Sequence, residues 1–230
     1  CEEGKGGYSI VLDRTAFFPG GGGQEADVGT INGFSVIKLA EMGEDIIHII
    51  QNELKVGDTV SCVLDKEIRL RRMQNHGGEH IVSGIVHRKY GFNNVGFHMG
   101  EDDITIDFDG VIPAEDLPAI EAEVNAGIWA DLPIRCWYPE PEELPQVTYR
   151  SKKALTGQVR LVRFPEVDLC ACCGTHVKRT GEIGFVKLFS CVKFHQGVRI
   201  EMACGARALD FLSKVYEQNR QVSQAFSAKV

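Results

Sequence analysis

The sequence predicts an α+β protein, with a small all-β region at the N-terminus and a mixed domain after it. Three observations carry this prediction. Apolar and polar residues alternate through the first 64 residues, and the hydrophobic period changes to that of a helix at Asp65. The strands and helices that follow do not alternate strictly, which disfavours a doubly wound sheet and favours a mixed sandwich. We therefore expect domains over residues 1–64 and 65–230.

The N-terminal region should form a small β-barrel or meander. Asn32 and Gly33 stand between two apolar runs, and this pair favours a hairpin because both residues tolerate a positive φ. Strands are predicted near residues 8–12, 28–31, 34–39, 46–50 and 59–64.

The second region opens on a long helix. Asp65 can cap its first turn and Gly91 can end it, which predicts a helix over residues 66–90. Further helices are expected over residues 114–129 and from about residue 206. Strands are predicted near residues 92–97, 104–108, 134–138, 160–164, 183–188 and 198–202.

Composition limits the class of protein. The 230 residues are 43% hydrophobic and 25% charged, which is typical of a globular chain and excludes disorder and collagen. No stretch approaches the roughly 18 apolar residues of a membrane span, and the first residues do not resemble a signal peptide. No membrane partner is therefore expected. The chain lacks an initiating Met and stops inside an apparent helix, so we expect a fragment or processed product.

Cysteine use and charge bear on compartment and partner. Eight cysteines are too few for a disulfide scaffold, and the group of Cys170, Cys172 and Cys173 suits metal ligation in a reducing compartment, so we predict a cytoplasmic protein. The net charge of −7 disfavours a generally basic nucleic-acid binder. Residues 150–199 are nevertheless rich in Lys and Arg, so they could contact phosphates or form a solvated face.

Two pairs of potential metal ligands lie far apart in the sequence. His76 and His80 stand at i and i+4 of the predicted helix, on one face, with two glycines between them that indicate a close approach to the backbone. Cys172 and His176 are also four residues apart. One sulfur and three nitrogens suit tetrahedral Zn²⁺, one ion per chain. Four protein ligands are equally typical of a purely structural zinc, so both roles stay open.

Three motifs together resemble the AlaX family, free-standing homologues of the alanyl-tRNA synthetase editing domain. They are Phe-Pro-Gly-Gly-Gly-Gly-Gln at 18–24 with Asp-Val-Gly-Thr at 27–30, His-Gly-Gly-Glu-His at 76–80, and Cys-Cys-Gly-Thr-His at 172–176. The resemblance implies a glycine-motif β-barrel packed on a two-layer α+β editing domain of the threonyl/alanyl-tRNA synthetase type. It also implies zinc, and hydrolysis in trans of tRNA(Ala) mischarged with serine or also with glycine.

The resemblance implies that zinc is held by His76, His80, Cys172 and His176. The chain departs from the family's Cys-Gly-Gly-Thr-His, because Cys173 replaces the first glycine. Cys172 is predicted as the ligand from its position in the motif, with Cys173 and Cys170 as alternatives.

The glycine stretch supplies further candidates. Its backbone N–H groups can approach a ligand closely, so Gly21, Gly22 and Gly23 are predicted to bind substrate. No Gly-Lys-Ser/Thr follows, and no nucleoside triphosphate is expected. By resemblance, Thr30 faces the aminoacyl group and helps to distinguish serine from alanine, although an ordinary strand threonine is the alternative. Gln24 could supply an amide nearby.

The remaining candidates are polar or basic. His98, at the end of a predicted strand, is a candidate base or donor in the pocket. Asp168 stands where the family often has an acid, and could orient a ligand imidazole or hold the substrate ammonium group. The three residues predicted to contact the tRNA backbone are Lys178, Arg179 and Arg199.

The leading prediction is thus a zinc-containing aminoacyl-tRNA deacylase. A synthetase site built for alanine cannot exclude glycine and rejects serine poorly, so a second, hydrolytic site is needed. One alternative is an inverted-motif zinc peptidase with Glu79 as general base. Another is a non-catalytic zinc-stapled tRNA-binding module, which would bind tRNA with a steep salt dependence and no turnover. The oligomeric state is not predicted.

Overall fold

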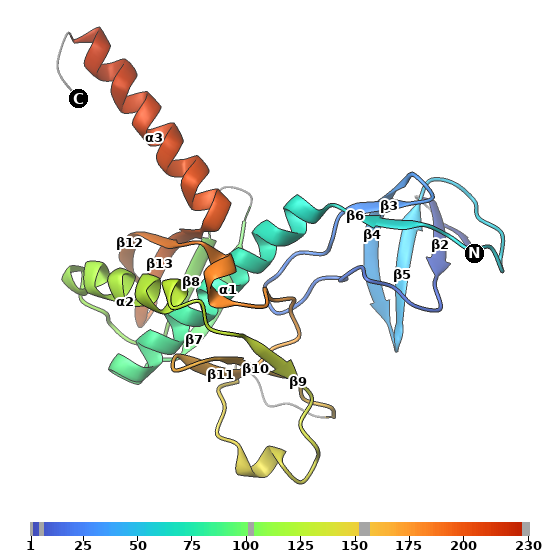
Figure 1. The fold of residues 1–230 in the computed structure, drawn as a ribbon, viewed down its shortest axis with the longest axis horizontal. Helices are drawn as coiled ribbons and strands as arrows, with labels where there is room; N and C mark the ends of the chain where they lie inside the picture. The colour runs from blue at the N-terminus through green and yellow to red at the C-terminus, as the bar shows by residue number, and fades with distance from the viewer. Residues whose placement is uncertain (1, 5–6, 101–103, 152–156, 227–230) are drawn as a thin grey trace.

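The computed structural model describes residues 2–4, 7–100, 104–151 and 157–226 (Figure 1). In these residues three α-helices combine with several antiparallel sheets, so the predicted α+β class is confirmed. None of their helices is long and apolar enough to cross a membrane.

The N-terminal strands form one antiparallel sheet of order β1-β2-β5-β4-β3-β6. The strands are β1 (Glu2–Gly4), β2 (Gly7–Val11), β3 (Gly29–Ile31), β4 (Phe34–Met42), β5 (Asp45–Ile50) and β6 (Cys62–Leu64). The predicted hairpin is present, because Asn32 and Gly33 both have positive φ where Ile31 pairs with Phe34.

The predicted barrel is not observed. Within the described residues no pairing joins the edge strands β1 and β6, so the sheet stays open. The physical reason is visible between β2 and β3, where residues 12–28 leave the sheet and reach the long helix over residues 66–90 instead of adding a strand (Figure 1). The buried side chains under this sheet are Ile10, Phe17, Ile31, Leu39 and Ile50.

The helix α1 (Lys66–Tyr90) has the predicted bounds. The Asp65 carboxylate accepts hydrogen bonds from two backbone N–H groups of the first turn, and Gly91 ends the helix at a φ of 74°. A side chain at Gly78 would overlap the Cys204 thiol, which explains why this helix contains glycine. Its central turns are buried and carry the two candidate histidines.

Helix α1 packs with α2 (Leu117–Trp129) around the main core. The four-stranded sheet β12-β13-β8-β7 contributes buried residues to the same core. Its strands are β7 (Asn94–Met99), β8 (Ile104–Phe108), β12 (Val186–Phe194) and β13 (Gly197–Cys204). The helix α3 (Gly205–Ala225) follows β13 and projects away from the body (Figure 1).

A small sheet, β11-β10-β9, lies beside α1. It contains β9 (Arg135–Trp137), β10 (Leu161–Phe164) and β11 (Asp168–Ala171). Strand β11 was missed by the sequence prediction, because cysteines and turn residues hide its short alternation. The strand predicted near 183–188 is also displaced, since a 3₁₀ turn, Thr180–Ile183, precedes β12.

Candidate metal centre and substrate pocket

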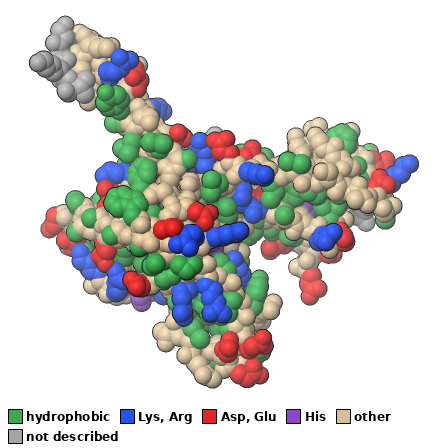
Figure 2. All heavy atoms as spheres, in the orientation of Figure 1, with side chains coloured by type: hydrophobic (Ala, Val, Ile, Leu, Met, Phe, Trp, Pro, Cys, Tyr) green, Lys and Arg blue, Asp and Glu red, His purple; other side chains and the backbone are tan. Residues whose placement is uncertain are grey.

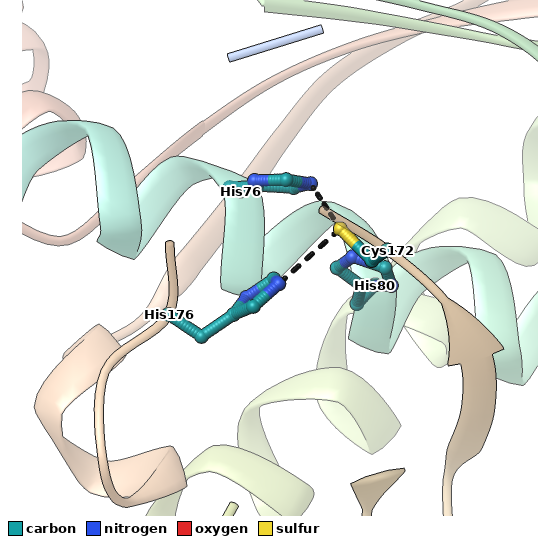
Figure 3. Close-up of side chains that lie close together, drawn as sticks. All are labelled: His76, His80, Cys172 and His176. Atoms are coloured by element: carbon teal, nitrogen blue, oxygen red, sulfur yellow. Dashed lines mark hydrogen bonds between the residues drawn. The ribbon is translucent and has the colours of Figure 1, made fainter. Parts of the chain in front are cut away.

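Four side chains from two distant segments converge on one point. His76 and His80 extend from α1, and Cys172 and His176 come from the segment after β11 (Figure 3). One potential ligand atom from each lies within 4.8 Å of the others. The Cys172 Sγ is 3.4 Å from Nε2 of His76 and 3.4 Å from Nε2 of His176. Tetrahedral zinc bonds would separate sulfur from nitrogen by about 3.6 Å, so the spacing fits such an ion.

Unsatisfied nitrogen supports the same fit. His80 is buried, and its Nε2 has no hydrogen-bond partner among the described residues. Its Nδ1 already faces Asp168 Oδ2 at 3.4 Å, which leaves Nε2 as the available ligand atom. A buried polar atom without a partner is unfavourable, and a bound cation would satisfy it. The Nδ1 of His176 also lacks a partner there, which the cluster does not explain.

The electrostatics favour a thiolate at Cys172. Burial alone would raise its pKa, but the charges of His76 and His80 bring the pKa well below its ordinary value. The deprotonated sulfur is the metal-binding form. Burial also lowers the pKa of His176 to about 3, which keeps its imidazole neutral. Both ligands are therefore in the form that donates electron pairs.

A second group, His80, Asp168 and Cys170, lies on the other side of the His80 ring. It fits a cation less well. Burial raises the pKa of Cys170 to about 11, so its thiol stays protonated. Asp168 is already bound in a bidentate ion pair by Arg150, with both N–O distances 2.7 Å. Although burial opposes ionisation, the bonds from His80 and Arg150 hold the pKa of Asp168 at about 2.

The loop of residues 20–24, which we call the glycine loop, also positions the cluster. Gln24 is buried, and its Oε1 accepts a hydrogen bond from Nδ1 of His76 at 2.8 Å and from the backbone N–H of Thr175 at 3.1 Å. Its Nε2 donates to the Thr175 hydroxyl. In the neutral form of His76, which is the form that binds metals, the proton on Nδ1 leaves the electron pair of Nε2 facing Cys172.

The loop itself depends on glycine. All four glycines from Gly20 to Gly23 have positive φ, and Gly21 and Gln24 exchange backbone hydrogen bonds of 2.9 and 3.0 Å. A Cβ at Gly23 would overlap the ring of Phe97, which stacks on His76. The backbone of this loop therefore lies directly against the cluster.

A cavity of about 370 Å³ opens beside three of the four candidate ligands, His76, His80 and Cys172, and this volume suits a small ligand. Its wall combines glycine-loop backbone, these three side chains and residues of the small sheet and its flanks. Residues in this wall include Gly22, His76, Glu79, His80, Tyr138, Arg150, Arg160 and Cys172.

Sequence comparisons identify related proteins. The family "Threonyl and Alanyl tRNA synthetase second additional domain" matches residues 159–201, and "tRNA synthetases class II (A)" matches residues 2–68. The chain is 35% identical to the alanyl-tRNA editing protein AlaX-L of Pyrococcus horikoshii, over 90% of this chain and 54% of that protein. It is a homologue of the alanyl-tRNA editing proteins.

Two further relatives match almost the whole of this chain. The alanyl-tRNA editing protein Aarsd1 of Bos taurus is 30% identical, over 96% of this chain and 50% of its own length. The alanine–tRNA ligase of Nitrosopumilus maritimus is 30% identical, over 96% of this chain and 26% of the ligase. The chain spans about half the length of the editing proteins that it matches.

The structure brings some predicted site residues together and not others. Gln24, Asp168 and Gly22 contact the cluster or its cavity. Thr30 lies in β3 of the N-terminal sheet, opposite Ser35, and is not in the cavity wall. His98 is exposed, because strand alternation directs its neighbour Phe97 to His76 instead. Cys173 is exposed beside the glycine loop and is part of the cavity wall, but it is not one of the four clustered side chains.

The three basic residues predicted to contact tRNA have different partners in the structure. Arg199 forms a bidentate pair with Asp107, and Arg179 pairs with Asp131. Lys178 is exposed, and its backbone oxygen accepts a hydrogen bond from Ile134, just before β9. None of the three is in the cavity wall.

Two functional arginines were missed. Arg150 holds Asp168, and Arg160 donates 2.8 Å hydrogen bonds to the backbone oxygens of Cys172 and Gly174. The sequence showed only a local excess of basic residues. Arg150 reaches Asp168 because it bridges to Cys170 of β11, and Arg160 lies directly before β10, where it bonds the chain after β11, so only these tertiary pairings could have identified them.

Proposed function

We propose that this chain is an aminoacyl-tRNA deacylase that hydrolyses, in trans, the ester of tRNA(Ala) mischarged with serine, or also with glycine. The observation that carries the proposal is the His76–His80–Cys172–His176 cluster, three of whose residues line a ligand-sized cavity, in a homologue of alanyl-tRNA editing proteins. We place residues 1–64 in a glycine-motif domain and residues 65–230 in an editing domain. The protein would act in the cytoplasm, consistent with the free cysteines of the described residues.

Zinc is the proposed ion, because one sulfur and three nitrogens at this spacing suit its tetrahedral coordination. When bound, it supplies a Lewis acid for ester polarisation or for lowering the pKa of a water. The chain's own residues prepare the site. Gln24 orients His76, Asp168 orients His80, and Gly22 brings the backbone into the cavity wall, where a developing oxyanion needs donors.

Purified protein should release serine, and glycine if it is a substrate, from the corresponding tRNA(Ala), while alanyl-tRNA(Ala) stays largely intact. Metal content is measured on the same sample. Equal hydrolysis of all three esters would contradict editing. Binding of tRNA without turnover would instead support the non-catalytic module. Peptide cleavage that is lost in Glu79→Gln would support the peptidase.

A further inference from the structure

A basic and aromatic surface lies on the small sheet, outside the cavity. Arg135 and Trp137 stand two residues apart on the edge strand β9, and Arg163 pairs with Arg135 from β10. The three side chains therefore share one face of the sheet. The guanidinium carbons of Arg135 and Arg163 lie 4.7 and 5.7 Å from the centre of the Trp137 ring. We call these three residues the Arg–Trp surface.

The charge of this surface is not compensated by the protein. Arg135 and Arg163 are exposed, and neither forms an ion pair or side-chain hydrogen bond in the part of the chain that the structure describes. Most other arginines are paired with carboxylates; examples are Arg69, Arg72, Arg88, Arg150, Arg179, Arg199 and Arg220. In a chain of net charge −7, two unpaired arginines on one aromatic ring indicate an anionic partner.

The Arg–Trp surface and the cavity meet at the edge strand β9, because strand alternation places the wall residues Tyr138 and Arg160 on the opposite face of the small sheet. Tyr138 follows Trp137 directly and is part of the cavity wall, and Arg160, next to the first residue of β10, is part of it too. Figure 2 shows basic side chains gathered over the region of β9 and β10. A chain whose last unit occupies the cavity can therefore leave it over the edge strand β9, across the Arg–Trp surface.

We propose that Arg135, Trp137 and Arg163 bind the unpaired nucleotides that precede the 3′-terminal adenosine of the aminoacyl-tRNA. This inference rests on the proposed deacylase function. Single-stranded RNA is bound by arginines that contact phosphates and by aromatic or guanidinium planes on which bases stack. The Trp137 ring holds the arginines in place before RNA binds, which reduces the entropy lost on binding.

The kinetic test uses the double variant Arg135→Gln/Arg163→Gln. Its substrates are seryl-tRNA(Ala) and 3′-seryl-adenosine, which lacks the preceding nucleotides. We expect the KM for seryl-tRNA(Ala) to rise roughly tenfold with kcat unchanged, since phosphate contacts contribute uniform binding. Hydrolysis of seryl-adenosine should not change. The control is Lys214→Gln/Arg220→Gln, which also removes two positive charges, both from exposed residues of α3, and should resemble the parent protein.

Unchanged KM for seryl-tRNA(Ala) in the double variant would overturn the proposal, as would an equal loss on seryl-adenosine. A binding measurement separates this result from failure of the deacylase function. The chain has two tryptophans, so Trp129→Phe leaves Trp137 as the only one. Its fluorescence should change with an uncharged RNA duplex that carries a single-stranded 3′ overhang, and much less with the blunt duplex.

The preference for the overhang should disappear in the triple variant Trp129→Phe/Arg135→Gln/Arg163→Gln. The affinities for the overhang and blunt duplexes are measured by competition with a labelled RNA. If the parent protein hydrolyses no ester but keeps this preference, the deacylase function fails and the Arg–Trp surface stands. If the parent hydrolyses seryl-tRNA(Ala) but shows no overhang preference, the Arg–Trp surface fails alone.

Discussion

The side-chain oxygen of Gln24 lies 2.8 Å from Nδ1 of His76 and accepts a hydrogen bond from it. Gln24 belongs to the glycine loop, whereas His76 lies on α1, so this bond joins the loop to the helix at the candidate metal centre. It also fixes the tautomer of His76, because a proton on Nδ1 leaves the electron pair on Nε2. The glycine loop thus helps to prepare a metal ligand as well as a cavity wall.

Gln24→Leu should weaken zinc binding by roughly 10- to 100-fold, the usual effect of removing a hydrogen-bond partner of a ligand histidine. Competition with a chromophoric chelator measures the affinity. Gln24→Glu is the matched control, because it keeps an acceptor for His76 while losing the donor to Thr175. An unchanged zinc affinity in Gln24→Leu would show that the loop does not support this ligand.

Cys172→Ala should lose zinc and deacylation together, because the thiolate supplies the one sulfur of the cluster. Elemental analysis should find about one zinc per chain in the parent protein, as for a single four-ligand site, and far less in the variant. Cys173→Ser is the control, since that neighbouring thiol is exposed and outside the cluster. If Cys172→Ala keeps the metal and Cys173→Ser loses it, Cys173 and not Cys172 is the ligand.

Gly23→Ala should displace the glycine loop, because its Cβ would overlap Phe97 and its φ is +88°. Gly33→Ala is a close control: its φ is +83°, but nothing lies within 4 Å of the added Cβ. We expect Gly33→Ala to lower the free energy of unfolding by about 1–2 kcal/mol, the cost of left-handed backbone for a residue with a Cβ. Gly23→Ala should cost more and also reduce deacylation. Denaturant unfolding and activity assays would compare the two, and equal effects would exclude a specific role for the loop.

His48 should make stability depend on pH. It is buried in the N-terminal sheet, where its Nε2 contacts the Thr15 hydroxyl at 2.9 Å. Burial lowers its pKa from 6.5, and backbone hydrogen bonds offset this only in part. Below pH 6.5 the unfolded chain therefore binds more protons at His48 than the folded chain does. The contribution of neutral His48 to the free energy of unfolding is fully present above that pH and is lost as the pH falls towards the folded-state pKa.

Urea unfolding of the parent and His48→Gln proteins, followed by circular dichroism between about pH 5 and 8, tests this expectation. The variant should lack the part of the slope that is due to one proton, which is at most about 1.4 kcal/mol per pH unit. His195→Gln removes an exposed histidine and should leave the slope unchanged. Identical slopes in the parent and His48→Gln would contradict the prediction.

The sequence was most informative where structure depends on neighbours along the chain. The cap at Asp65 and the left-handed Gly91 predicted both ends of α1, and the tight turn at Asn32 and Gly33 predicted the first hairpin. The spacings of four residues placed each ligand pair on adjacent turns or one short loop. These features follow from local sterics and backbone hydrogen bonding, which a short stretch of sequence contains in full.

Tertiary structure alone decided which distant residues meet. The contacts of Gln24 with His76, of Arg150 with Asp168, and of Arg163 with Arg135 depend on how the loop, helix and strands pack. It also decided that residues 12–28 cross to α1, which leaves the N-terminal sheet open. Hydrophobic periodicity indicates which face of an element is buried, but it carries no information about which element covers that face.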